Sequence, residues 1–263
     1  MSNANVKVPV VCTRGIIVFP GQDVMIEVGR SKSINAVNLA VDAYDKMVWI
    51  VCQQDMMVDN PGIKDLYSTG TLAKIKVLRK KEGFMRVTFT GMKRARLVQL
   101  EDSDRIMMAD VEPVDDIHGD PMEEMALVKR IISEFEHMST ITASFPQEVI
   151  RQFSNGVSAV ALTDQFAQYF MMDQAAKQKL LETADVNERM LLIIAELNKQ
   201  QKYSQIEHSS MKRSKSASMT TRKNTSCVKR CVRSKRNWAM FPILPMMRHR
   251  SARCWIRTRI RIM

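Results

Sequence analysis

The 263-residue chain lacks the sequence features of several common protein classes. No run of about 18 apolar residues occurs, so the sequence predicts no transmembrane helix. The N-terminus, M-S-N-A-N-V-K-V-P, has neither the basic nor the apolar segment of a signal peptide, which favours a cytoplasmic protein. Its five cysteines are widely spaced and form no C-x-x-C pair, which argues against a disulfide framework or a zinc site.

Recognisable catalytic motifs are also missing. The chain contains no G-x-x-x-x-G-K-[ST] phosphate loop, no G-x-S-x-G and no H-E-x-x-H. The adjacent acids Asp115-Asp116 and Glu123-Glu124 are explained by linker solvation and by a helix dipole. We therefore predict no catalytic, cofactor-binding or metal-binding residue. Motif spacing detects only residues that are close in sequence, so this prediction does not cover a triad assembled from distant residues. The histidines are isolated from one another: His118, His137, His208 and His249.

Charge is distributed very unevenly along the chain. The formal net charge is +12, and 16 of the 40 Lys and Arg residues lie in Ser209–Met263, which contains no Asp or Glu. Residues 1–208 therefore carry 24 basic against 28 acidic residues, a balance of −4, and the tail carries +16. Such asymmetry is typical of chains with a tail that binds nucleic acid or a membrane surface.

The N-terminal segment predicts a β-rich domain. Val8–Val18 is apolar enough for a buried strand, and Phe19-Pro20-Gly21 predicts a turn before a second strand, as in a β-hairpin. Ser31 is a good N-cap for a helix, and Met47–Cys52 is a short apolar strand in which Cys52, like Cys12, is expected to be a buried thiol.

More strands are predicted between residues 70 and 111. Gly70–Arg79 alternates, with Ala73, Ile75 and Val77 predicted on its apolar face. Lys81-Glu82-Gly83 predicts a hairpin, and the expected strands that follow are Met85–Thr90, Arg94–Leu100 and Ile106–Val111. Six or seven short strands with one helix favour a curled sheet or small barrel in residues 1–113.

Helical signals dominate after a linker at Pro113–Pro121. Asp120-Pro121 predicts a helix start, with Met125, Val128, Ile132 and Phe135 on its apolar face. Further helices are predicted at Ser144–Asn155, Ser158–Phe170 and Asp173–Leu181, followed by a long one capped by Asp185 with the stripe Met190, Leu191, Ile194 and Leu197. The fold class is therefore α+β, with a helical bundle in residues 121–208 whose last helix projects outward.

Several co-ordered motifs resemble the N-terminal domain of the Lon family of ATP-dependent proteases. They cover about residues 8 to 208. They are V-P-V-V-C-T-R-G-I-I-V-F-P-G at Val8–Gly21, V-G-R-S-K-S-I-N-A-V at Val28–Val37, D-L-Y-S-T-G-T-L-A-K-I at Asp65–Ile75, T-G-M-K-R-A-R-L at Thr90–Leu97 and L-L-E-T-A-D-V-N-E-R-M at Leu180–Met190.

This resemblance implies a PUA-like β subdomain, a helical bundle and a role in binding unfolded, damaged or tagged protein substrates. In the family, an ATPase module and a Ser-Lys protease module follow, and the assembly is a homohexamer. No position of this chain matches the family's catalytic residues or nucleotide loop, so we expect no enzymatic activity and no cofactor. We expect a monomer or weak oligomer with no membrane partner. The substrate-binding residues are unknown from sequence, although an exposed apolar patch is the expected surface.

The tail departs from the family after about His208. Codons for Arg222–Pro242 can be chosen so that a neighbouring frame reads E-E-Y-F-L-R-E-A-M-R-A-I-Q-K-E-L-G-D-V-P, which resembles the family's continuing helix. We therefore interpret residues 209–263 as a basic, disordered tail produced by a frameshift, and the chain as a truncated family member.

Two other interpretations remain at this stage. PUA-like folds also serve RNA binding, and the basic tail, with Trp238, Phe241 and Trp255, could hold phosphates and stack on bases. Against that interpretation, residues 1–208 are slightly acidic, so nucleic acid would bind only nonspecifically through the tail. The third interpretation is a stand-alone adaptor with no protease partner.

Overall fold

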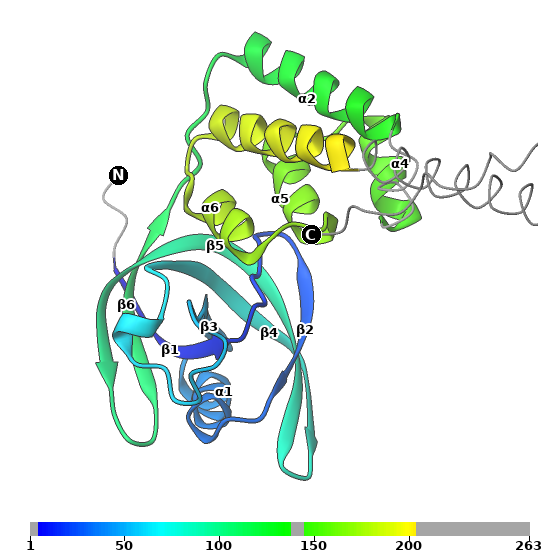
Figure 1. Cartoon of the computed structure of the whole chain (residues 1–263). Helices are drawn as coiled ribbons and strands as arrows, with labels where there is room; N and C mark the ends of the chain where they lie inside the picture. The colour runs from blue at the N-terminus through cyan, green and yellow to red at the C-terminus, as the bar shows by residue number, and fades with distance from the viewer. Residues whose placement is uncertain (1–4, 138–144, 204–263) are drawn as a thin grey trace, which may run out of the picture. The chain divides into compact units, whose positions relative to one another are not determined.

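The computed structural model describes residues 5–137 and 145–203 of the chain (Figure 1). Their strands form one six-stranded sheet in the order β2-β5-β4-β3-β1-β6, and β6 also pairs with β5. This second pairing joins the two ends of the row β5-β4-β3-β1-β6, so these strands close into a small barrel and β2 extends the sheet from β5. The strands are β1 (Val6–Thr13), β2 (Asp23–Val28), β3 (Met47–Cys52), β4 (Thr69–Lys81), β5 (Phe84–Asp102) and β6 (Met107–Val114).

The predicted hairpin of the first two strands is wrong. β1 pairs in parallel with β3 and antiparallel with β6, whereas β2 pairs with β5. The strand ends at Thr13, and the apolar residues after it serve two different cores because their side chains alternate. Val18 joins the barrel core, and Ile17 and Phe19 join the core of the helices. This alternation explains why the whole stretch is apolar although only its first part is a strand.

The two strands predicted at residues 85–90 and 94–100 are one continuous strand, β5. Its first half pairs with β2 and its second half with β6, while β4 runs along most of its length. Gly91 lies where the chain after Phe19 crosses β5, and backbone hydrogen bonds link Gly91 to Gly21 and Gln22 at 2.9 Å. A Cβ atom on Gly91 would lie 2.2 Å from the Phe19 carbonyl oxygen, so only glycine permits this approach.

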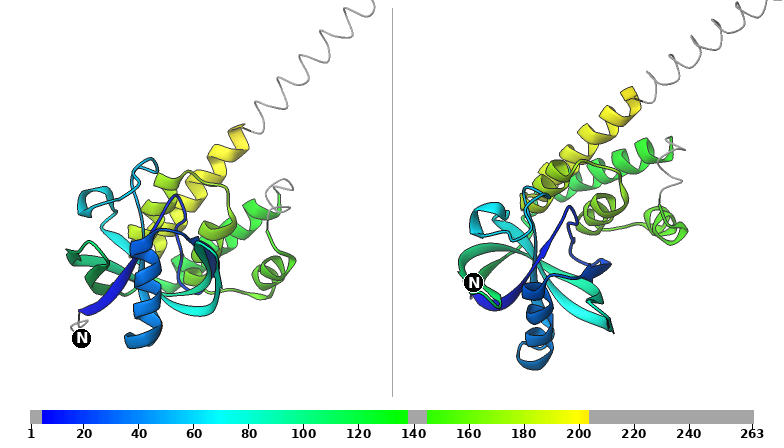
Figure 2. Two further views of the ribbon diagram at one scale, coloured as in Figure 1. Left: turned by 90° about the horizontal axis from the view of Figure 1, so that it is seen from below. Right: turned by 60° about the horizontal axis from the view of Figure 1, so that its bottom comes forward.

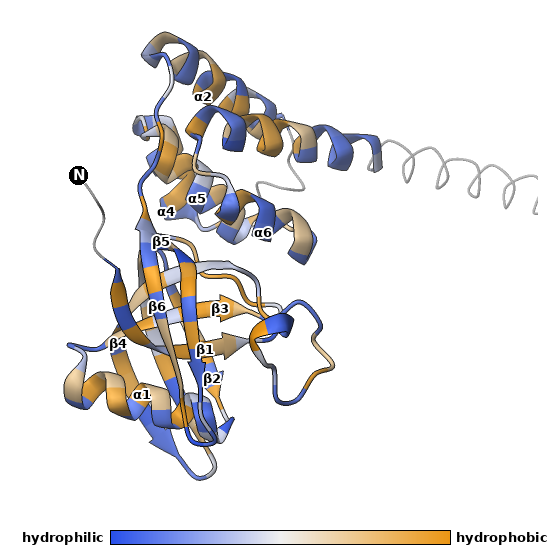
Figure 3. Ribbon diagram, turned by 90° about the vertical axis from the view of Figure 1, so that its left-hand side faces the viewer, coloured by the Kyte–Doolittle hydropathy of each residue, from blue (hydrophilic) through white to orange (hydrophobic). Residues whose placement is uncertain are grey.

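The predicted alternation of β4 is wrong at Val77 because the strand contains a bulge. The register shifts between Ile75 and Val77, which leaves Lys76 as an extra residue opposite β5. Beyond the bulge the faces are exchanged, so Val77 is exposed and Leu78 packs against the barrel core. Figure 3 shows apolar and polar residues alternating along the strands.

Helix α1 (Ser31–Ala43) supplies the crossover that two parallel strands require. It connects β2 to β3 and lies beside the barrel (Figure 2). Its residues Ala36, Val37 and Ala40 are buried in the barrel core. The residue at its N-cap is Arg30, not Ser31, and no side chain caps the first turn.

The helical part follows its predicted order. Asp120 caps α2 by accepting a hydrogen bond from the Met122 amide, Ser158 caps α5, and Asp185 accepts from the Glu188 amide ahead of the last helix. The helices are α2 (Pro121–Glu136), α4 (Gln147–Asn155), α5 (Ala159–Tyr169), α6 (Gln174–Glu182) and a helix over residues 186–203.

Phenylalanines fill the core between these helices. Phe135 makes edge-to-face contacts with Phe145 and Phe166, at ring-centroid distances of 4.8 and 5.3 Å. Two predicted core positions are wrong: Met125 and Leu191 are exposed. Ile131 and Ile193 of the same two helices are buried. The predicted start of α4 at Ser144 and the tail at 209–263 lie outside the described residues.

Candidate binding surface

Within residues 5–137 and 145–203, no group of three or more His, Cys, Asp or Glu side chains gathers as a metal site would require. His118 pairs with Glu124 at 3.1 Å on the surface, and His137 ends α2. None of the helices in this part of the chain is long and apolar enough to cross a membrane.

A buried cluster of four charges joins the barrel to the helices. Arg94 of β5 and Arg189 of the last helix both contact Asp164 of α5, and both contact Asp116 of the linker. Each of the two arginines is at most 3% exposed. Each carboxylate lies between two guanidinium groups, so the cluster is balanced in charge.

Burial shifts the pKa of two members of this cluster, Asp164 and Arg189. It raises the pKa of Asp164, with Arg94 and Arg189 acting in the opposite direction. Burial also lowers the pKa of Arg189, and the neighbouring Arg94 lowers it further. Because both acids are saturated by arginines, the arrangement is suited to holding the two parts of the fold together, and no carboxylate is left free for acid–base chemistry.

Neutral contacts reinforce the same junction. Gln178 of α6 donates to the Thr69 carbonyl oxygen at 2.9 Å, and Gln174 donates to the Gln53 carbonyl oxygen at 2.8 Å. Phe19, which is fully buried, packs into the helical core. The barrel and the helices therefore share polar and apolar contacts.

Exposed apolar side chains lie on three neighbouring loops. A Cβ atom on Gly15 would lie 3.1 Å from the Met56 sulfur and 3.6 Å from the Gln174 side-chain oxygen, so the loops at residues 14–16 and 53–62 adjoin the start of α6. Met57 is 87% exposed and Met171 is 77% exposed. The residues that we name the apolar rim are Ile16, Met56, Met57 and Met171.

Methionine suits a surface that binds varied partners. Its side chain is unbranched, flexible and polarisable, so it adapts to different shapes. Exposed apolar residues that cluster are typical of interaction sites, whereas single ones are ordinary. Other large apolar side chains are exposed elsewhere on the described residues: Met25, Val77, Met92, Val98, Ile117, Met122, Met125 and Leu191.

Sequence reasoning named no binding residue, and it missed the charged junction. Asp164 gave a usable signal, because an acid within the apolar helix Ser158–Phe170 needs a buried cationic partner. Arg94 gave none, because a basic residue in a one-sided strand is ordinarily solvated. The apolar rim could not be foreseen either, since its members come from three separate loops.

Comparisons with known proteins agree with this fold. The family model for the ATP-dependent protease La (LON) substrate-binding domain matches residues 7–199. Lon protease from Escherichia coli K12 is 32% identical over 203 residues, which are 77% of this chain and 26% of that protein. Lon protease 1 from Bacillus subtilis is 28% identical over 202 residues. The chain thus spans about a quarter of the length of these relatives.

Solved structures share the architecture. The N-terminal domain of Mycobacterium avium complex Lon protease aligns with a TM-score of 0.61 at 22% identity, over 73% of this chain and 98% of that structure. A Lon N-terminal domain protein from Xanthomonas campestris aligns with a TM-score of 0.51 at 15% identity. The order of strands and helices, the closed barrel and the extent of the family match lead to one assignment: the chain belongs to the LON substrate-binding domain family.

Proposed function

We propose that the chain binds unfolded or damaged polypeptides and that the apolar rim is part of the surface it uses. The family match over residues 7–199 carries the proposal, because it is a match to a substrate-binding domain. The exposed methionines at residues 56, 57 and 171 support it, since unfolded chains differ from folded ones chiefly in their accessible apolar side chains.

The test is binding of a permanently unfolded protein to the full chain. Reduced and carboxymethylated α-lactalbumin, labelled with a fluorophore, serves as the probe, and native α-lactalbumin serves as the folded control. About 0.5 M salt screens the basic tail from the probe. We expect saturable binding of the unfolded probe only, and equal binding of both forms would contradict the proposal.

Paired substitutions locate the surface. Met56→Ser with Met57→Ser removes two apolar contacts, each worth about 1 kcal/mol when partly buried, so we expect roughly thirtyfold weaker binding. Met122→Ser is the matched control, because Met122 is 79% exposed on α2 and is not part of the apolar rim. If the control variant lost as much affinity as the rim variant, the rim would not be the binding surface.

We further propose that other modules supply the chemistry of the whole assembly. The family match covers a non-catalytic domain, and the relatives are about four times longer than the aligned region. The purified chain should therefore neither hydrolyse ATP nor cleave casein. It should sediment as a monomer or weak oligomer, and we keep the cytoplasm as its predicted location.

The proposed division of the chain is a β-rich subdomain at 1–113, a helical bundle at 121–208 and a tail at 209–263. We keep the frameshift hypothesis for the tail because its acid-free composition contrasts with the residues before it. Resequencing of the coding DNA across codons 200 to 263 and past the stop tests it. We expect a shifted frame that continues into a phosphate loop and a Ser-Lys site, and unrelated DNA there would overturn the hypothesis.

A further inference from the structure

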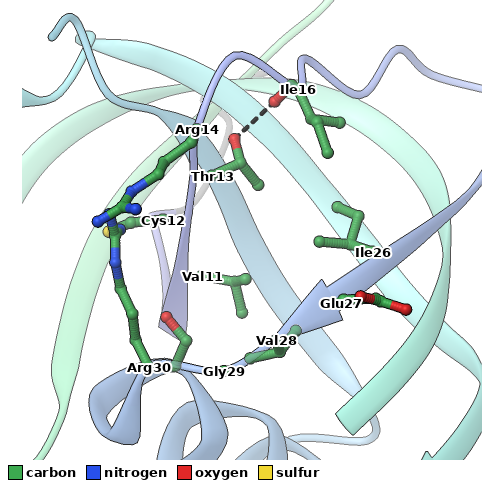
Figure 4. Close-up of a pocket in the computed structure, with 11 residues that line it drawn as sticks. Val11, Cys12, Thr13, Arg14, Ile16, Ile26, Glu27, Val28, Gly29 and Arg30 are labelled. Atoms are coloured by element: carbon green, nitrogen blue, oxygen red, sulfur yellow. Dashed lines mark hydrogen bonds between the residues drawn. The ribbon is translucent and has the colours of Figure 1, made fainter. Parts of the chain in front are cut away.

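A cavity of about 310 Å³ opens beside the apolar rim, at the end of β1, along β2 and at the first turn of α1 (Figure 4). Arg14 and Arg30 lie on one side of it, and Ile26 and Glu27 lie on the other. Its walls combine cationic, hydroxyl and aliphatic groups. The proposed function does not account for the polar part of this cavity.

Arg30 is held in place with one nitrogen left unsatisfied. Its Nη2 donates to the Gln53 side-chain oxygen at 2.8 Å and to the Val58 carbonyl oxygen at 3.3 Å, and Gln53 is fully buried. Its Nη1 is buried and has no hydrogen-bond acceptor among the described residues. An unsatisfied buried donor costs free energy, and an anionic oxygen is the strongest acceptor for a guanidinium group.

No ion pair holds the guanidinium of Arg30 within the described part of the chain. Burial and the neighbouring Arg14 lower its pKa, and Cys12 and Asp59 act in the opposite direction. Arg14 contacts Asp59 at 2.5 Å, but the Asp59 side chain is 88% exposed to solvent. Two guanidinium groups at one end of a cavity are chemically suited to binding an anion.

The first turn of α1 adds further donors to the same cavity. Ser33 lines it and is only 5% exposed. The N-cap residue Arg30 makes no side-chain hydrogen bond to the turn, so the amide groups at this helix end are not capped. The helix dipole favours negative charge there.

The opposite wall of the cavity is aliphatic and suits an apolar group. Ile16, Ile26 and Val28 line it. Glu27 is the one acid on the lining, and its carboxylate is neutralised by Arg86 at 2.7 Å on the exposed face of the sheet. A small inorganic anion would use the polar end and leave the aliphatic wall unoccupied.

We propose that this cavity binds a carboxylate attached to an apolar group, with Arg14, Arg30 and Ser33 holding the carboxylate and the aliphatic wall holding the apolar part. Either a free apolar acid or the C-terminus of a polypeptide that ends in an apolar residue presents this chemistry. The site does not depend on the proposed function, since it rests on the cavity and on the two arginines that line it.

The test is NMR of the uniformly ¹⁵N-labelled full chain, with the amide signals of residues 31–33 as the reporters. A site-resolved signal is needed because the basic tail binds anions unselectively. N-acetyl-leucine is the probe, and N-acetyl-leucinamide is its uncharged match. We expect saturable shifts with a millimolar Kd for the acid and at least tenfold weaker binding of the amide. Absence of shifts at 50 mM acid, or equal binding of acid and amide, would overturn the proposal.

Three substitutions and one control assign the contacts. Arg30→Gln should weaken binding of N-acetyl-leucine at least tenfold, and Arg14→Gln and Ser33→Ala about threefold each. Lys93→Gln is the control, because Lys93 is exposed, pairs with Asp115 and does not line the cavity. Arg14 lies on the surface, so its variant remains informative even if the Arg30 variant fails to fold. Unchanged binding in both the Arg14 and Ser33 variants would exclude the site.

A peptide arm separates the two sources of carboxylate. An eight-residue peptide that ends in leucine is compared as the free acid and as the amide. Tighter binding of the free-acid peptide than of N-acetyl-leucine identifies a polypeptide C-terminus as the ligand. Weaker binding of that peptide identifies a small apolar acid, and either result keeps the carboxylate site. The apolar-rim variant tests unfolded-protein binding, whereas this titration tests the cavity. Either proposal can therefore be contradicted without the other.

Discussion

Cys12 illustrates how burial controls the chemistry of a single residue. Its thiol lies at the cavity beside α1, and burial raises its pKa to about 11, although Arg30 acts against this. Because the thiolate is the reactive form, a thiol with this pKa has about 100-fold less thiolate at pH 8 than one with a pKa of 9.0. The residue is therefore an inert structural cysteine, despite two arginines nearby.

We predict slow alkylation of Cys12. In a variant with Cys52, Cys227, Cys231 and Cys254 replaced by serine, iodoacetamide should modify the native chain about 100-fold more slowly at pH 8 than the same chain in 6 M guanidinium chloride. The rate should rise with pH up to about pH 11. The same pKa shift makes the free energy of unfolding fall as the pH rises above about 9, because the unfolded thiol ionises first. Native and unfolded chains that react equally fast would disprove the shift.

Asp164 is the single residue on which the charged junction depends most. Asp164→Asn keeps the shape of the side chain but leaves Arg94 and Arg189 with one acid instead of two. A buried charge without its partner costs about 3 kcal/mol, so we expect a loss of this order in the free energy of unfolding by urea denaturation. Asp23→Asn is the control: its ion pair with Lys76 is exposed, so less than about 1 kcal/mol should be lost.

At the level of elements, the crossing of β5 by the chain after Phe19 depends on one glycine. Gly91→Ala would place a methyl group 2.2 Å from a backbone oxygen that is itself fixed by neighbouring hydrogen bonds. Because neither backbone can move freely, we expect a loss of about 2 to 3 kcal/mol in thermal or urea unfolding. Gly29→Ala is the matched control, since no atom lies within 4 Å of its Cβ position, and it should be nearly neutral.

The elements show what sequence can and cannot predict. Helix starts at Asp120-Pro121, Ser158 and Asp185 follow from local hydrogen bonding, and the structure confirms them. Strand pairing is not local, so the partners of β1 and β2 were not predictable from the turn between them. The bulge at Lys76, which exchanges the buried and exposed faces of β4, was not predictable for the same reason. A bulge is an extra residue relative to the paired strand, so it cannot be recognised from β4 alone.

The two proposed binding surfaces were even less predictable from sequence than the strand pairing. The apolar rim and the carboxylate cavity each combine residues from separate loops and elements, and the family resemblance carried no contact residues. The resemblance did carry the fold class, which the structure and the comparisons confirm. The sequence thus specified the scaffold through local patterns, whereas the sites arise from how the elements meet.

At the scale of the whole molecule, charge divides the chain into a body of −4 and a tail of +16. We predict that a chain ending at residue 208 has the same free energy of unfolding as the full chain, within about 0.5 kcal/mol, because every core residue in the part of the chain that the structure describes lies before Gln200. We expect the chain to bind nucleic acid only through the tail. Affinity of the full chain for single-stranded RNA should fall steeply between 50 and 200 mM salt, because each neutralised phosphate releases a counterion.

Residues 1–208 should show no RNA binding by fluorescence anisotropy, while their affinity for unfolded α-lactalbumin stays that of the full chain. This separation follows from the slightly acidic body, which repels phosphates, and from the position of the apolar rim within it. Sequence-selective RNA binding retained by residues 1–208 would instead assign nucleic-acid recognition to the barrel. Unfolded-protein binding lost with the tail would show that the tail, and not the rim, makes those contacts.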